Sequence, residues 1–249
     1  DPLNPKAGAD VDFMISVEGS NEVDAKFVRL IHGDQNPDGP GFIEEEIEVD
    51  LPSVLAVKRQ YTKIGSFAQC ADPDGKLDGL QSFTLFAHVY PTQRKNERQT
   101  IMGRWTIDRN KGYGLGIDPE GHVSLWVGDG KNVDHIATEI PLIPHAWYFV
   151  AASFDAITKK ASVHVINCVN SWNSRISTVV PFEGDSWVEE ELRTVPSATG
   201  GDADFNMAAA TAWNQQLGKY AAFLFNGKLD RSGVYGRALG RDEIKALAS

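Results

Sequence analysis

Short segments that alternate apolar and polar residues, separated by turns, run through most of this 249-residue sequence. They restrict its fold more than any other feature, because alternation is typical of strands with one buried face. In the second part of the chain we expect strands over residues 66–71, 82–90, 99–105, 112–117, 122–127, 147–154 and 161–166. The spacing predicts an all-β protein, an antiparallel β-sandwich or barrel.

Helix signals are few. Residues 241–248 carry Ile244 and Leu247 one turn apart, which predicts a short surface helix. Ser186 and Glu189 have the spacing of a capping box, which predicts a second short helix through Leu192.

An N-terminal β extension is expected over residues 1–60. Residues 44–51 are predicted to form a strand in which Glu44, Glu46, Glu48 and Asp50 occupy alternate positions, so their carboxylates share one face, about 7 Å apart along the strand. A glycosidase needs two carboxyl groups that flank the bond it cleaves. Because Glu45 adds a charge on the opposite face, we interpret the segment as an acidic edge strand whose charges discourage pairing.

Charge and hydropathy exclude two classes of function. The chain has 24 basic and 34 acidic residues, a net charge of −10, whereas a nucleic-acid-binding protein usually presents a basic face. No apolar run approaches the roughly 20 residues of a membrane-spanning helix. The sequence starts at Asp1 without an initiator Met or a signal-peptide pattern, so we expect a processed or excerpted chain.

The second part of the chain resembles a known fold. Residues 147–155 (WYFVAASFD), followed by residues 160–165 (KASVHV), resemble the central hairpin of laminin-G-like, concanavalin A-like jelly rolls. Residues 225–230 and 234–239, together with Glu243, Ile244 and Leu247, resemble the final strand and helix of that fold. The resemblance implies a jelly-roll domain over residues 61–249, after the extension of residues 1–60.

The first part narrows the resemblance to one family. Residues 28–34 (VRLIHGD), with Asn36-Pro37 and Gly39-Pro40-Gly41, are similar to the start of the N,N-dimethylformamidase large subunit, as are residues 65–67 and 99–102. This implies the β-sandwich portion of a cytoplasmic amide hydrolase that acts on small formamides. The other domains or subunits of that hydrolase would be its partners, and the portion would serve assembly or access to the active site.

The same resemblance implies that the chemistry lies elsewhere. In that family a single iron ion is held by two Tyr and a Glu beyond the jelly roll, and no residue of this chain matches that portion. We therefore assign no catalytic residue and no cofactor to this chain, and iron would belong to the missing portion. The sequence also lacks a Gly-x-Ser-x-Gly nucleophile motif.

A lectin-like, glycan-binding module is the alternative. Trp172, Trp187 and Trp213 lie in an irregular region between Cys168 and Phe223, longer than a jelly-roll connection needs. Long loops are often functional, so these aromatic side chains are predicted to contact a ligand or a partner. Equally, they could fold inward and cover a sheet.

Two further features leave alternatives open. Asp72, Asp74 and Asp78 offer three carboxylates within one turn, which suits calcium, although Asp-Pro-Asp-Gly is also a plain turn. Cys70 and Cys168 are either a disulfide or two free thiols.

Overall fold

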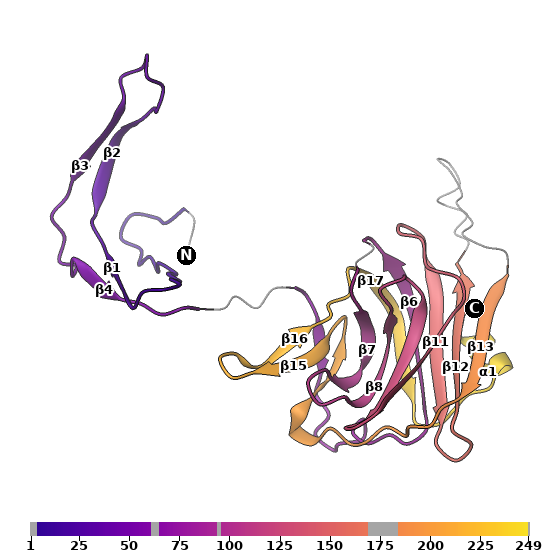
Figure 1. Cartoon of the computed structure of the whole chain (residues 1–249). Coiled ribbons are helices and arrows are strands. Elements are labelled where there is room, and N and C mark those ends of the chain that lie inside the picture. The colour runs from indigo at the N-terminus through magenta and orange to yellow at the C-terminus, as the bar shows by residue number, and fades with distance from the viewer. Residues whose placement is uncertain (1–3, 61–64, 94–95, 169–183, 249) are drawn as a thin grey trace. The chain divides into compact units, whose positions relative to one another are not determined.

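The computed structural model describes residues 4–60, 65–93, 96–168 and 184–248. The chain divides into two compact units, Asp1–Thr62 and Lys63–Ser249. Strands are the main regular elements of both units (Figure 1). We call the second unit the sandwich, and residues 4–60 the N-terminal arm.

The sandwich contains two sheets (Figure 1). Five antiparallel strands form one sheet in the order β13-β12-β11-β6-β17: β6 (Phe83–Pro91), β11 (Tyr148–Asp155), β12 (Lys160–Asn167), β13 (Asp185–Glu191) and β17 (Gly227–Tyr235). The other sheet has eight strands: β5 (Ala68–Cys70), β7 (Gln99–Thr106), β8 (Lys111–Ile117), β9 (Val123–Asp129), β10 (Val133–Ala137), β14 (Phe205–Met207), β15 (Ala210–Asn214) and β16 (Gly218–Ala222). A 3-10 turn, Gly200–Asp202, precedes β14. The predicted all-β sandwich is confirmed.

The main core fills the space between the two sheets. Alternate residues of β6 and β11 point into it, and they meet alternate residues of β8 and β9 from the opposite sheet. The rings of Phe83 and Tyr113 stack there with centroids 4.5 Å apart. Each fully buried side chain of this size stabilises the fold by about 1.5–3 kcal/mol.

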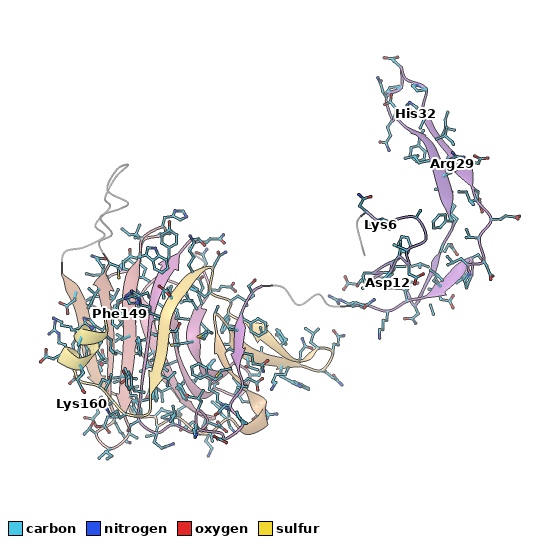
Figure 2. All side chains as sticks on the ribbon, turned by 180° about the vertical axis from the view of Figure 1, so that it is seen from behind. Lys6, Asp12, Arg29, His32, Phe149 and Lys160 are labelled. Atoms are coloured by element: carbon cyan, nitrogen blue, oxygen red, sulfur yellow. The ribbon has the colours of Figure 1, made fainter. Side chains whose placement is uncertain are left out.

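The outer face of the five-stranded sheet is also covered. Helix α1 (Arg241–Leu247) places Ile244 against Phe149 and Ala151 of β11. Figure 2 shows Phe149 on the face where α1 lies. Strand β11 is thus buried on both faces, which explains why its sequence is an almost continuous apolar run.

Strand β13 replaces a predicted helix. Residues 185–191 pair antiparallel with β12, Val188 opposite Val163. The helix expected from Ser186 and Glu189 is therefore wrong, because pairing with β12 overrides a local capping signal. The C-terminal helix is confirmed as α1.

The N-terminal arm consists of two small antiparallel sheets. Strand β1 (Glu22–Asp24) pairs with β4 (Val54–Ala56), and β2 (Val28–Gly33) pairs with β3 (Phe42–Glu46). No residue between 4 and 60 is buried. The arm therefore has a defined backbone but no hydrophobic core of its own. None of the helices in the described ranges has the length and apolar character needed to cross a membrane.

Candidate functional site

Large apolar side chains are exposed along the N-terminal arm. Met14 and Phe13 are 82% and 72% exposed. The other exposed large apolar residues of the arm are Val11, Phe27, Leu30, Ile31, Phe42, Ile43, Ile47, Val49, Leu51 and Val54. Such a concentration of exposed apolar side chains is typical of an interaction surface.

The β2–β3 hairpin presents these residues on both of its faces. Cross-strand partners share a face, so Leu30 lies beside Glu44 on one face and Arg29 beside Glu45 on the other. After a bulge, His32 lies opposite Ile43. Figure 2 shows side chains, including those of Arg29 and His32, projecting outward from the hairpin. Neither face is a buried face, and each mixes apolar groups with carboxylates.

The arm is also strongly acidic. Residues 4–60 carry 12 acidic and 5 basic side chains, whereas residues 61–249 carry 21 and 19. Carboxylates concentrate at residues 44–50, where Lys26 pairs with Glu44. The remaining carboxylates of this stretch, those of Glu45, Glu46, Glu48 and Asp50, form no ion pair with a described residue. The predicted strand over residues 44–51 is shorter in the structure and ends at Glu46.

The predicted calcium ligands are only partly brought together. Arg104 of β7 lies between Asp72 and Asp78: its Nη1 is 3.0 Å from Asp72 Oδ2, and its Nε is 3.2 Å from Asp78 Oδ1. Asp74 points elsewhere and pairs with Lys76 at 2.8 Å. The guanidinium thus supplies the positive charge between Asp72 and Asp78.

Asp78 is held by further hydrogen bonds. Its carboxylate accepts bonds from the backbone amides of Thr199 and Gly200, at 2.8 and 2.9 Å. Burial opposes ionisation, but these bonds and Arg104 outweigh it, so the pKa of Asp78 lies below its ordinary value. Within the described ranges no three His, Cys, Asp or Glu side chains are arranged to hold a metal ion. Calcium binding at these residues stays a prediction.

The predicted tryptophan contacts do not form one site. Trp213 lies on β15 and is 55% exposed. Trp187 lies on β13 in the other sheet, half-buried beside Arg241 of α1 and against the imidazole of His164. Trp172 lies outside the described residues. The two cysteines are free thiols, Cys70 exposed and Cys168 partly buried.

A histidine–aspartate pair holds α1 onto the sandwich. His164 Nε2 is 2.8 Å from Asp185 Oδ2, which also contacts Arg241 and Lys245 of α1 at 3.2 and 3.0 Å. Burial lowers the pKa of the fully buried His164 imidazole. Although burial alone would raise it, the pKa of Asp185 is lowered by hydrogen bonds from these three partners. The arrangement resembles a catalytic base and its orienting group. The other partners of Asp185, however, are Arg241 and Lys245, which attach α1 to the sheet.

A cavity of about 170 Å³ lies at β5, β14, β15 and β16 in the eight-stranded sheet, and sequence reasoning missed it. Its lining residues are Phe67, Gln69, Asp204, Asn206, Thr211, Lys219, Tyr220 and Ala221. Lys219 pairs with Asp204 at 2.6 Å, and Asn206 Nδ2 donates to Thr211 Oγ1 at 3.0 Å. These residues come from distant segments, so no local sequence signal marks them.

The fold defines a concanavalin A-like jelly roll. Residues 65–186 match the laminin-G family described as the Concanavalin A-like lectin/glucanases superfamily. Among solved structures, the CBM40 module of a Ruminococcus gnavus IT-sialidase is similar with a TM-score of 0.51 and 15% identity, over 70% of this chain and 85% of that one. At this identity the likeness concerns the fold alone.

Two curated relatives match this chain at higher sequence identity and over nearly its whole length. The chain is 33% identical to the N,N-dimethylformamidase beta subunit of Alcaligenes sp, over 97% of this chain and 32% of the relative. It is also 33% identical to the beta subunit of the Paracoccus aminophilus dimethylformamidase, over 100% of this chain and 32% of the relative. The expected similarity to dimethylformamidase is thus found, and these relatives are named beta subunits. The chain spans about a third of their length.

Proposed function

We propose that this chain is the non-catalytic β-sandwich part of a dimethylformamidase-like amide hydrolase and serves subunit assembly or access to an active site carried elsewhere. The N-terminal arm is the observation that carries this proposal, since it exposes large apolar side chains and buries none. A segment of this kind gains stability by binding another surface. Similarity to part of a hydrolase subunit indicates which assembly it would join.

The ionisable groups of the sandwich support a structural role. Arg104 links Asp72 and Asp78 near β7, while His164 and Asp185 fasten α1. In this proposal the iron, its ligands and the reacting groups belong outside this chain.

An activity assay tests the non-catalytic role. The purified chain is incubated with N,N-dimethylformamide, and formate and dimethylamine are measured. We expect no release above the protein-free control, whereas the longer natural protein that contains this sequence should release both. Turnover by the isolated chain would overturn the proposal.

A lectin-like binding module is the second candidate, and the cavity beside Tyr220 favours it. About 170 Å³ is smaller than the roughly 300–1,000 Å³ of typical ligand sites, so we propose a single sugar ring as its ligand. Tyr220 would stack on the ring, and Gln69 and Lys219 would bind its hydroxyl groups. Binding measured on a glycan panel should weaken in Tyr220→Ala but not in Trp213→Ala, which lies outside the cavity lining. A flat response across the panel eliminates this candidate.

A further inference from the structure

We infer that the N-terminal arm docks onto a protein surface that is apolar at its centre and rimmed by Lys and Arg side chains. This inference rests on the proposed function, because it names the kind of partner through which the chain would assemble. It follows from three properties of the arm: its missing core, its preformed backbone and its charge.

The arm cannot be stabilised by its own side chains alone. Its two sheets have two strands each, and two-stranded sheets are at best marginally stable in water. Val23 and Leu55, which face each other across β1 and β4, are only half-buried. The apolar side chains of residues 42–51 are exposed throughout. An apolar partner surface would supply the burial that the arm lacks.

The arm nevertheless has a shape that a partner can recognise. The backbone amide of Ile47 donates to Phe27 O at 2.9 Å and so continues the hairpin beyond β3. Gln60 Nε2 donates to Ile15 O at 2.8 Å, and Ser16 Oγ donates to Gln60 O at 3.0 Å, which ties the start of the arm to its end. Among the described residues β2 and β3 pair only with each other, so each also keeps an open strand edge.

The net negative charge of the arm indicates which kind of partner surface it can bind. The arm has seven more acidic than basic side chains, and residues 42–51 contain five carboxylates and no basic residue. A second copy of the arm would bring the same excess and be repelled. Anionic lipid headgroups and nucleic-acid phosphates are disfavoured for the same reason. A basic rim around an apolar centre complements both the carboxylates and the exposed side chains between them.

The sandwich offers a matched control for a charge-reversal experiment. Glu44, Glu45 and Glu46 are consecutive on β3, and Lys26 pairs with the first of them. Glu189, Glu190 and Glu191 are consecutive on β13, and Lys160 pairs with the first of those. Both runs are therefore three strand glutamates with one lysine partner, and they differ in whether they belong to the arm.

The experiment uses the longer natural protein, purified with its partners from the source cells. We expect Glu44→Lys/Glu45→Lys/Glu46→Lys to weaken partner retention by about tenfold or more in size-exclusion chromatography. The triple replacement Glu189→Lys/Glu190→Lys/Glu191→Lys should retain the partner. A sandwich that melts as in the parent protein shows that the arm replacements do not unfold the sandwich, and the corresponding Gln triple should give a smaller loss of partner retention.

Zero-length carbodiimide crosslinking of the same complex identifies the surface. The carboxylates of Glu45, Glu46 and Glu48 should couple to lysines that flank an apolar segment outside the arm. Coupling between two arms, or equal retention by both triple variants, overturns the inference. If deletion of residues 4–60 still abolishes assembly in that case, the proposed function stands without this partner chemistry. If the deletion also leaves assembly intact, the assembly role itself is wrong.

Discussion

At the scale of single residues, Arg104 joins three segments of the sandwich through its polar contacts. It lies between Asp72 and Asp78, donates from Nε to Thr199 Oγ1 at 2.8 Å, and reaches Gly200 O through Nη2 at 3.0 Å. One side chain thus connects β7, the turn around residue 75 and the segment before β14. Its role is to order these loops at one end of the sandwich.

Replacing Arg104 should be costly. Arg104→Met leaves two largely buried carboxylates without their cation, so we expect a loss of about 3–5 kcal/mol in the free energy of unfolding. Urea denaturation at neutral pH measures this loss. Arg109→Met is the control, because Arg109 forms an exposed pair with Asp202 and should cost no more than about 1 kcal/mol. Equal losses in the two variants would contradict the structural role of Arg104.

The His164–Asp185 pair predicts a pH dependence. Both groups have folded-state pKa values below their ordinary values, so the unfolded chain binds more protons at acidic pH and stability falls as pH falls. The His164 contribution should be lost below its ordinary pKa of 6.5, and that of Asp185 below 3.8. Unfolding free energies measured between pH 7 and pH 4 should decline less in His164→Gln than in the parent. Parallel profiles for the two proteins would show that His164 does not contribute.

At the scale of elements, the close approach of neighbouring atoms explains the glycine at position 116 of β8 but not the one at position 114. A Cβ at Gly116 would lie 2.3 Å from Gln99 O and 2.6 Å from the Trp126 ring, whereas a Cβ at Gly114 would have no neighbour closer than 3.7 Å. We expect Gly116→Ala to destabilise the sandwich by about 1–3 kcal/mol. Gly114→Ala should be close to neutral. Thermal unfolding of both variants checks the difference, and similar melting temperatures would contradict it.

Elements with local signals were predictable from the sequence, and those set by distant partners were not. The apolar run of β11 and the alternating residues of β12 predict both strands to within a residue or two, because both strands line the core. The residues of β13 carry a capping signal that predicts a helix, and pairing with β12 decides otherwise. The sequence predicts the turn at Asp72. It does not predict the contact of this turn with Arg104, which is more than 30 residues away and reaches it only through the sheet topology. The cavity beside Tyr220 could not be predicted from the sequence either, because its lining residues come from distant segments.

At the scale of the whole molecule, the division into two units predicts separate stabilities. The buried residues of the main core all come from the sandwich, between Phe83 and Phe225. We therefore expect deletion of residues 4–60 to leave the melting temperature of the sandwich within about 2 °C of the parent value, since a loss of 1 kcal/mol would shift it by roughly 2–4 °C. Differential scanning calorimetry measures this, with Phe154→Ala in the core as a destabilised reference. A large fall in the deletion variant would mean that the arm supports the sandwich.

The alternation of carboxylates and apolar side chains at residues 42–51 also bears on the time before assembly. The arm precedes the sandwich in this sequence, so the ribosome makes it first, when no partner is yet bound. An uncharged strand with these apolar residues would be prone to stack on other nascent chains. Glutamates in and beside such a strand act as gatekeepers against aggregation. The charges that select a basic partner would therefore also keep the newly made chain in solution until that partner arrives.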